Sequence, residues 1–490
     1  MLLYSGILCY NNYVYSSLRR MIGYGSQTHS LCPDFFMAGR EFLRSFRASH
    51  RAESPVRIHC TLKNGADQMS DFVRKNICDG VAFGSITDDR FKIGRLSATL
   101  ITPLDRKTAA ANALLSCVLT RSCKKYPDFT ALSKKLDSLY GAALYPSVRQ
   151  IGDYQAVSVA ASGIEDRFAL DGQSVSSELA ELLCSILFDP NVENGLFNDE
   201  DIEQERRQLI ENIDAEFNEK RIYAIKRCID EMCAEEAYSI GRNGSREEVL
   251  ALKNEDIYAA WKTLLANARV ELTMLGSSNP EKAYKGFEGY FAGSPRMIPP
   301  TDVSVGKPEQ VKRITEKEDL SQSKLVMGLR TAYFKNDRDC LANSVMSAVL
   351  GGTPTSKLFM NVREKESLCY YCVSRVDNNK GIMLIDSGVE TENISRTEES
   401  VLRQLELMKK GEITKAELEE AKLAIKNSLL SSLDSLAAMQ GFYIGGVLRE
   451  GQMSPAEAAA ATDDVTMERV IELANAVELD TVYALEGNRD

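Results

Sequence analysis

The sequence predicts an α+β protein of two homologous lobes, each a largely antiparallel sheet packed with long helices. The first observation is an internal repeat, because the same order of strand-like and helix-like segments occurs twice along the 490 residues. The second is that strands and helices do not alternate strictly, which disfavours a doubly wound parallel sheet. The third is a proline-rich stretch between the two copies, which is typical of an extended connector.

The first 68 residues differ from the rest of the chain. Residues 1–68 hold eight Lys or Arg against four Asp or Glu and lack helical or strand periodicity, so we expect little stable structure there. From Met69 onwards, apolar and polar residues alternate as in the first strands of a sheet. Two interpretations stay open: translation begins at Met69 and the preceding residues are not native, or they form a basic targeting arm.

The first copy of the repeat predicts a lobe over residues 69–292. A strand at 95–103 is followed by a helical pattern at 108–121, a second helical segment and a strand at 153–166. Residues 254–276 then predict a helix of about four turns and a terminal strand.

The second copy predicts a lobe over residues 312–490, after a linker at 293–311. Its strand at 323–334, helix at 338–352, mixed segment at 356–377 and strand at 381–392 repeat the first lobe in order. Residues 466–487 repeat the closing helix and strand. The alignment pairs Tyr140 with Tyr370, and Ser162-Gly163 with Ser387-Gly388.

Composition excludes several functions. The chain carries 59 basic and 70 acidic residues, a net charge of −11, which argues against a general binder of nucleic acid or anionic membranes. No run of about 18 apolar residues predicts a membrane span, and the N-terminus lacks the pattern of an export signal. Twelve scattered cysteines in such a chain are typical of reduced thiols, so we expect a cytoplasmic protein.

Histidine is scarce and unevenly placed. The three histidines are His29, His50 and His59, so the chain from Cys60 to Asp490 has none. This excludes histidine metal ligands, Ser-His-Asp or Cys-His nucleophile systems and histidine general bases from any site in the two lobes.

Residues 351–375, GGTPTSKLFMNVREKESLCYYCVSR, resemble the signature of the pitrilysin/insulinase family of zinc peptidases. In that family a glycine-rich turn precedes a Ser-Arg/Lys-Leu-Phe helix and then Val-Arg-Glu-Lys-x-(Gly/Ser)-Leu-x-Tyr. The resemblance runs from Met69 to the end of the chain and includes the two-lobe repeat, so it implies a pitrilysin-like or processing-peptidase-like fold.

The same resemblance implies that the zinc motif is degenerate. Active members carry His-x-x-Glu-His on the first long helix, where both imidazoles share one helical face. Here the slot falls on Ala113, Ser116 and Cys117: the first has no donor atom, the second is a poor base and the third alone cannot hold zinc. We therefore expect no metal or other cofactor in this chain, and zinc in a partner subunit.

A later helix of the family supplies a third zinc ligand, and its form survives over residues 197–221. Periodicity predicts that Ile202, Leu209, Ile213 and Phe217 mark the buried stripe of this helix. Glu205 and Glu211 lie near the position of the family's helix glutamates, but we expect them on a solvated face.

The second lobe keeps the arginine and the tyrosine of the family motif. The resemblance implies that Arg363 and Tyr370 reach the active site and hydrogen-bond the substrate backbone, since a guanidinium and a phenol both donate to carbonyl oxygens. The alternative is a surface Arg-Glu pair and a tyrosine in the core. Nearby, Cys369 and Cys372 form a C-x-x-C, but residues three apart in a strand point to opposite faces, so we expect buried cysteines rather than a redox or zinc site.

The sequence therefore predicts a non-catalytic, substrate-binding subunit of a two-chain peptidase that does not hydrolyse peptides by itself. By the resemblance, the partner is a homologous zinc-binding chain that carries the metalloendopeptidase activity on a peptide substrate. The alternative is a scaffold protein similar to the core subunits of a respiratory complex. An active zinc peptidase with unusual ligands is disfavoured, because histidine is absent from both lobes.

Overall fold

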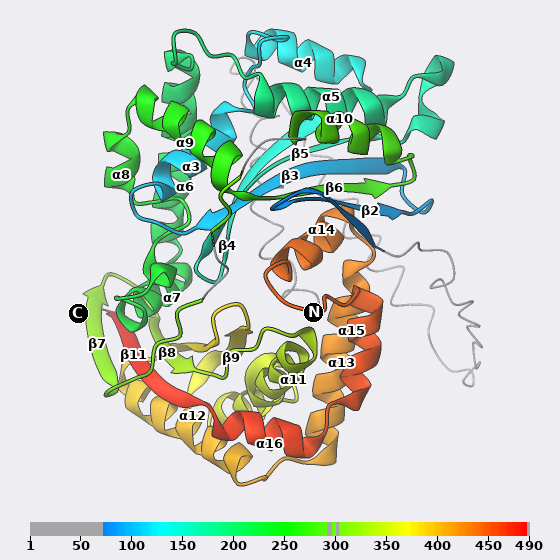
Figure 1. Cartoon of the computed structure of the whole chain (residues 1–490). Helices are drawn as coiled ribbons and strands as arrows, with labels where there is room; N and C mark the ends of the chain where they lie inside the picture. Colours follow the sequence, from blue (N-terminus) through cyan, green and yellow to red (C-terminus); the bar gives the residue numbers. More distant parts are fainter. Residues whose placement is uncertain (1–71, 292–295, 300–302, 488–490) are drawn as a thin grey trace, which may run out of the picture. The chain divides into compact units, whose positions relative to one another are not determined.

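The computed structural model describes residues 72–291, 296–299 and 303–487, so the expectation for residues 1–68 lies outside the described residues. Two sheets organise the described chain (Figure 1). We call the part built on the first sheet lobe 1 and the part built on the second sheet lobe 2. The predicted α+β class with two related lobes is confirmed.

The two sheets have the same strand order once the first strand is set aside. Lobe 1 has the order β1-β2-β6-β3-β5-β4, and lobe 2 has the order β7-β11-β8-β10-β9. In both lobes the pair β2–β6 or β7–β11 is parallel and the pairs after it are antiparallel. The strands of lobe 1 are β1 (Val73–Cys78), β2 (Val81–Thr87), β3 (Ile93–Pro103), β4 (Ala143–Ile151), β5 (Tyr154–Ile164) and β6 (Arg269–Gly276). Those of lobe 2 are β7 (Lys312–Glu318), β8 (Ser323–Arg330), β9 (Cys369–Asp377), β10 (Ile382–Val389) and β11 (Glu478–Gly487).

The helices repeat in the same way. Those of lobe 1 are α3 (Ala109–Val118), α4 (Phe129–Ser138), α5 (Val175–Phe188), α6 (Asp199–Asn218), α7 (Lys220–Met232), α8 (Arg246–Ala251), α9 (Asn254–Asn267) and α10 (Glu281–Phe291). Those of lobe 2 are α11 (Asp337–Ser347), α12 (Ile394–Lys409), α13 (Lys415–Ser432), α14 (Leu436–Gly445), α15 (Pro455–Ala461) and α16 (Met467–Asn475), with a π-helical segment η7 (Leu358–Lys365) before β9. Between α10 and β7 the described residues are neither helix nor strand.

Apolar and hydroxyl side chains alternate along β3, and both faces of the first sheet are buried. In β3, Leu96, Ala98 and Leu100 belong to the hydrophobic core beneath the helices of lobe 1. Ser97 and Thr99 point to the opposite face, yet both are fully buried. Each satisfies its hydroxyl locally, Ser97 with Thr273 at 2.5 Å and Thr99 with Ser158 at 2.8 Å.

The element that buries this second face comes from lobe 2. Helix α14 packs against β3 and β6, as Figure 1 shows beneath the sheet of lobe 1. Its Gln440 donates to Ser97 Oγ at 2.7 Å and accepts from Arg95 Nε at 2.5 Å. The ring of Tyr443 stacks on Phe72, with 3.9 Å between centroids.

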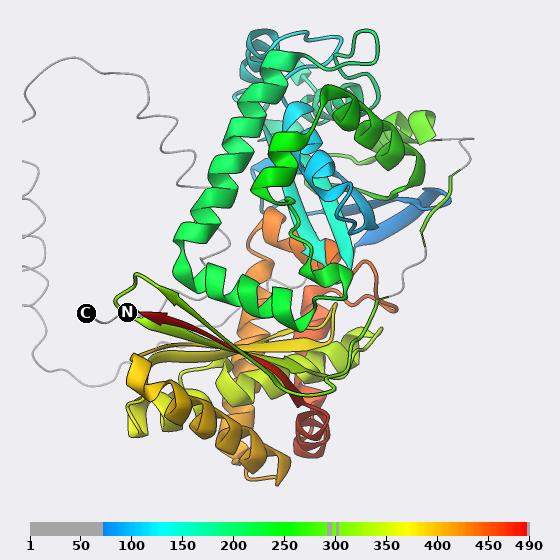
Figure 2. The same ribbon diagram turned by 90° about the vertical axis from the view of Figure 1, so that its left-hand side faces the viewer.

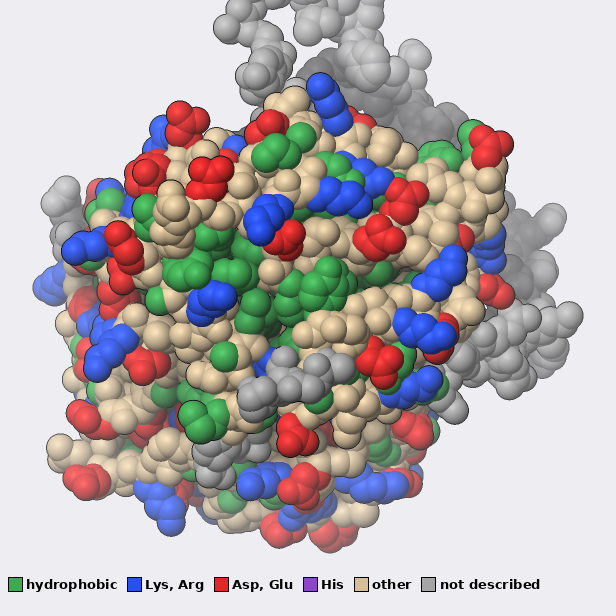
Figure 3. Space-filling model, turned by 45° about the horizontal axis from the view of Figure 1, so that its top comes forward, with side chains coloured by type: hydrophobic (Ala, Val, Ile, Leu, Met, Phe, Trp, Pro, Cys, Tyr) green, Lys and Arg blue, Asp and Glu red, His purple; other side chains and the backbone are tan. Residues whose placement is uncertain are grey.

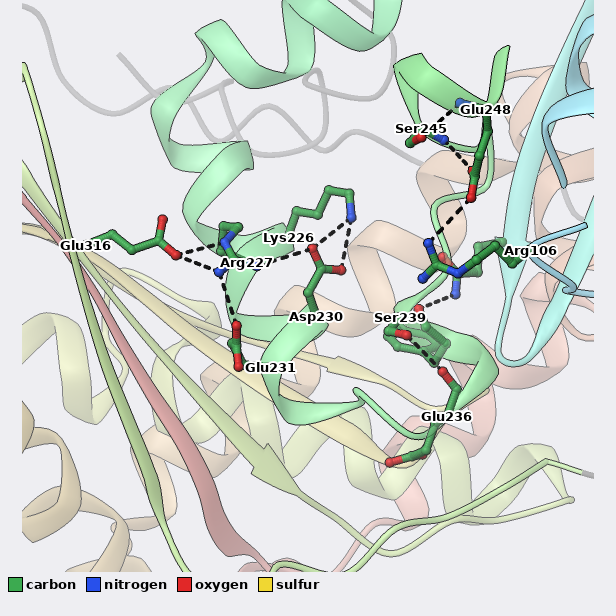
Figure 4. A network of polar contacts seen from close by, with 12 residues as sticks. Arg106, Lys226, Arg227, Asp230, Glu231, Glu236, Ser239, Ser245, Glu248 and Glu316 are labelled. Atoms are coloured by element: carbon green, nitrogen blue, oxygen red, sulfur yellow. Dashed lines mark hydrogen bonds and ion pairs between the residues drawn. The ribbon is translucent and has the colours of Figure 1, made fainter. Parts of the chain in front are cut away.

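Lobe 1 covers the sheet of lobe 2 in the same manner. Helix α7 packs against β8 and β11, and Figure 2 shows it lying across the second sheet after the long helix α6. Arg227 of α7 reaches Glu316 of β7 at 2.6 Å and also pairs with Glu231 (Figure 4). Because α6–α7 and α13–α14 occupy equivalent places in the repeat, each lobe gives one helix to the sheet of the other.

A buried ion cluster lies where the lobes meet. Lys380, in the turn between β9 and β10, is 0% exposed and its Nζ lies 2.7 Å from both Asp153 Oδ1 and Glu236 Oε2. Arg330 pairs with Glu236 at 2.7 Å and with Asp480 at 2.8 Å. We call these five residues the interlobe ion cluster, since they come from β8, β11 and the turns of both lobes.

The cluster depends on a close approach of two turns. Gly152, in the turn between β4 and β5, has a φ of 55°, and a Cβ there would lie 2.3 Å from the backbone oxygen of Asn379. Glycine is therefore required for this contact. The connector joins it as well, because the Ser304 backbone N–H donates to Asp153 at 2.7 Å and its carbonyl accepts from Lys380.

The outer surface agrees with the composition. On the face in Figure 3, Lys and Arg are interspersed with Asp and Glu around a band of hydrophobic side chains, without an extended basic area. Within the described ranges, every helix is too short or too polar to cross a bilayer.

We predict that Lys380→Met destabilises the chain by roughly 3–5 kcal/mol, because it leaves buried carboxylates without their cation. Urea denaturation monitored by circular dichroism measures the effect. Lys226→Met is the matched control: Lys226 pairs with Asp230 at 2.9 Å on an exposed helix face, so its loss is expected to cost less than about 1 kcal/mol. Equal losses in both variants would show that the cluster is not important for stability.

Candidate functional site

The slot that the resemblance assigns to the zinc motif lies on α3, against α6, α9 and the sheet. Ala113 is buried in the core of lobe 1. Ser116 is also buried, and its hydroxyl donates to the Ala113 backbone oxygen at 2.8 Å within the same helix. Two of the three slot residues are therefore engaged in packing and in the helix itself.

Cys117 is held as a neutral thiol. Burial, with the nearby negative charge of Glu205, raises the pKa of the Cys117 thiol to about 12. Without a metal ion beside it, the Cys117 thiol is therefore protonated at neutral pH.

Helix α6 brings an acidic side chain to the slot, and an arginine neutralises it. Asn198 caps α6 by accepting from the backbone N–H groups of the first turn, and Asp201 and Glu205 lie one turn apart beyond it. Arg121, just after α3, lies 3.3 Å from Asp201 Oδ1 and 3.6 Å from Glu205 Oε1. Its guanidinium also stacks over the Phe129 ring at 4.2 Å. A side-chain cation therefore balances the acids that face the slot.

The predicted stripe of α6 is correct except at its end. Ile202 and Leu209 are buried and Ile213 packs on the core, but Phe217 is 48% exposed. The expectation for Phe217 was wrong because α6 ends at Asn218, so the ring turns to Tyr223 of α7, with 4.9 Å between centroids. The prediction that Glu205 lies on a solvated face was also wrong, since it is partly buried in an ion pair, whereas Glu211 is exposed.

The residues at the slot do not fit a zinc ion. Ala113 has no donor atom, the Ser116 hydroxyl donates to the helix backbone and Glu205 is paired with Arg121, which leaves Cys117 alone. Zinc sites of this kind need three protein ligands and an open position. Across the part of the chain that the structure describes, no group of three or more His, Cys, Asp or Glu residues is placed to hold a metal ion.

Arg363 lies near the end of η7, and its side chain is 38% exposed. Its Nη1 is 3.4 Å from Glu364 Oε1, and its guanidinium lies over the Phe359 ring at 4.5 Å. An exposed ion pair of this length is weak, with a value of about 0–1 kcal/mol. The guanidinium is therefore oriented by the ring, and the surface Arg-Glu pair of the alternative interpretation is present at this residue.

Tyr370 is the extra residue of a β-bulge. In the pairing of β9 with β10, Gly388 opposes Tyr371 and Val389 opposes Cys369, which leaves Tyr370 without a partner. The tyrosine is 58% exposed, and its hydroxyl donates to Glu390 Oε1 at 2.6 Å. The alternative of a core tyrosine does not hold for this residue.

The same bulge changes the expectation for the C-x-x-C. Cys369 and Cys372 both lie in the core of lobe 2, because the extra residue between them restores a common face. The prediction of opposite faces was wrong, and the thiols interact. The hydrogen bond from the Cys372 thiol lowers the pKa of Cys369, aided by the charge of Arg363, and raises the pKa of Cys372. Both cysteines are free and buried, as predicted.

Two residues of the site were not predicted from the sequence. Arg121 has no signal other than its place three residues after the slot helix. Glu390 does have one: the aligned Ser162-Gly163 and Ser387-Gly388 pairs each continue into an apolar residue and a glutamate, Glu165 in lobe 1 and Glu390 in lobe 2. Extending the repeat by two residues would have found it.

Comparisons with known proteins agree with this geometry. Residues 251–425 match the family described as Peptidase M16 inactive domain. The chain is 27% identical over 409 residues to the probable inactive metalloprotease YmfF of Bacillus subtilis, a match that covers 83% of this chain and 96% of the relative. It is also 31% identical over 134 residues to the uncharacterized zinc protease YmxG of Bacillus subtilis, which covers 26% of this chain and 32% of that relative.

A solved structure extends the similarity to three dimensions. The crystal structure of a conserved protein from Enterococcus faecalis matches with a TM-score of 0.78 and 27% sequence identity, over 86% of this chain and all of the other. Over most of its length, the chain is therefore similar to M16-type peptidases, including a relative described as a probable inactive metalloprotease.

Proposed function

We propose that the chain is the substrate-binding subunit of a two-chain peptidase, whose homologous partner carries zinc and cleaves the peptide. The observation that carries the proposal is a contrast between the two sites. The slot on α3 is filled by packing and an ion pair, whereas Arg363 and Tyr370 present polar groups to solvent.

The position of these two residues suits a peptide backbone. Tyr370 lies on β9, the last strand of its sheet, and Arg363 precedes that strand at the end of η7. A guanidinium offers five N–H donors in a fixed plane, which suits carbonyl oxygens. Both groups are therefore accessible from one edge of lobe 2, where an extended chain is able to approach.

A scaffold role without peptide binding is the second candidate. The interlobe ion cluster and the exchanged helices α7 and α14 favour it, because they hold the two lobes as one unit. The two candidates differ in what Arg363 and Tyr370 do, so substitutions there separate them.

We predict that mixing this chain with a homologous partner that has an intact His-x-x-Glu-His motif gives peptide cleavage that neither chain gives alone. Arg363→Ala and Tyr370→Phe are each expected to lower kcat/KM of the mixture about tenfold, since each removes a hydrogen bond to substrate. A fluorogenic casein peptide measures the rate.

Matched controls use exposed residues outside the two proposed hydrogen bonds. Lys365→Ala removes a positive charge from the same helix end, and Tyr290→Phe removes a hydroxyl from an exposed tyrosine of lobe 1, so neither should change the rate. Full activity of the partner alone, or normal rates with Arg363→Ala and Tyr370→Phe, would contradict the subunit role and favour the scaffold.

We also predict that the purified chain keeps far less than one zinc ion per molecule after exposure to zinc and dialysis. The reason is that Ala113 has no donor atom and Ser116 donates to the helix backbone, so that Cys117 alone does not complete a zinc site. Inductively coupled plasma mass spectrometry measures the metal, with the partner chain as positive control. Stoichiometric zinc that is lost in Cys117→Ser would show that the slot on α3 binds the metal.

A further inference from the structure

We infer that Glu390 makes Tyr370 a hydrogen-bond acceptor for a backbone N–H group of the bound peptide, rather than the donor that the family resemblance implies. The inference rests on the proposed function and concerns how the same site recognises its ligand. Glu390 acts here as a positioning residue, because it works through the phenol.

The direction of the bond follows from the two groups. A phenol has one proton, and an ionised carboxylate only accepts hydrogen bonds. The distance of 2.6 Å between Tyr370 Oη and Glu390 Oε1 is in the range of charge-assisted O–H···O⁻ bonds. The proton of Tyr370 is therefore committed to Glu390, and the phenol has no second proton for a peptide carbonyl.

The phenolic oxygen keeps its accepting capacity. Donation to a carboxylate draws the proton away from the oxygen and increases its electron density, which favours an N–H donor as its next partner. The same bond and the charge of Glu390 raise the pKa of Tyr370 above its ordinary value. An oxyanion would be a poor partner for such an oxygen, which agrees with a site that binds peptide and carries no catalytic metal.

Arg363 supplies the hydrogen-bond donor that complements Tyr370 as acceptor. The guanidinium only donates, so it suits a peptide carbonyl, whereas Tyr370 held by Glu390 accepts from a peptide N–H. An extended peptide offers both groups at every residue. The β-bulge keeps Tyr370 out of the ladder with β10, and the buried Cys369 anchors the strand on one side of it.

The internal repeat places a glutamate after the equivalent strand of each lobe, and the two glutamates have different partners. Glu165 follows β5 as Glu390 follows β10, but it is buried and accepts from the Ser278 hydroxyl at 2.5 Å. Lobe 1 thus uses this acid inside the fold, whereas lobe 2 uses it at the exposed Tyr370. The position is structural in one copy and available for ligand recognition in the other.

The first test uses the free chain. Ionisation of Tyr370 is followed by ultraviolet titration as the difference between the chain and its Tyr370→Phe variant. Glu390→Gln, which keeps the size of the side chain, is expected to move this ionisation to lower pH. Glu399→Gln, at an exposed acid of α12, is the control and should leave it unchanged. An unchanged midpoint in Glu390→Gln would overturn the inference.

The second test uses peptide binding to the pair of chains, with a partner whose catalytic glutamate is replaced by glutamine. Short fluorescein-labelled casein peptides are compared with analogues in which one amide N–H is replaced by an ester oxygen. The inference predicts that one ester position weakens binding roughly three- to tenfold, and that this loss disappears in Tyr370→Phe. Glu390→Gln should weaken binding of the all-amide peptide.

The outcomes distinguish the acceptor role of Tyr370 from the substrate-binding function of the chain. Peptide binding without a Tyr370-dependent ester position, or tighter binding in Glu390→Gln, would overturn the acceptor role and leave the substrate-binding function in place. If the pair binds none of the peptides, the proposed function itself is wrong.

Discussion

The interlobe ion cluster is the contact on which the rest of the structure depends. Lys380 is fully buried between carboxylates from the β4–β5 turn and from the segment after α7, while Arg330 ties the same glutamate to β11. Burial alone would raise the pKa of Glu236, but hydrogen bonds from Arg330 and Lys380 outweigh it and hold the pKa below its ordinary value. Charges of this kind are stable in the interior only when all partners are in place, so the cluster fixes one arrangement of the lobes.

The arrangement of the two lobes determines which polar side chains are buried and which are exposed to solvent. With the turns locked together, α7 covers the second sheet and α14 covers the first, so polar side chains on these faces, such as Ser97 and Thr99, are satisfied inside the protein. The edge strand β9 is not covered in this way at Tyr370. The fold therefore leaves Tyr370 exposed at the edge strand of lobe 2.

The slot on α3 follows the same electrostatic logic as the cluster. The partly buried carboxylate of Glu205 lies near Cys117, and Arg121 supplies a positive charge beside it. The acid at the slot is therefore paired with a side-chain cation of the same lobe.

Much of the fold was predictable, because the spacing of apolar residues in each copy of the repeat distinguishes strands from helices. The order of elements, the sheet class and the core of α6 up to Ile213 were all accessible in this way. Backbone irregularities were not. The bulge at Tyr370 places Cys369 and Cys372 on the same face of β9. The turn before the edge strand is a second example. Tyr140 has a φ of 59° in the turn before β4, and the residue with the matching conformation before β9 is Ser367, with a φ of 52°, and not Tyr370. Long-range charge pairing such as Arg121 with Glu205 depends on tertiary distances that spacing does not encode.

Photocrosslinking identifies which of the two chains contacts the peptide. A photoreactive casein peptide is added to the pair of chains with an inactivated partner, and mass spectrometry locates the adducts. If this chain binds the substrate, adducts are expected on it around η7 and the first residues of β9, and they are lost when unlabelled peptide is in excess. Adducts confined to the partner would contradict a substrate-binding role for this chain.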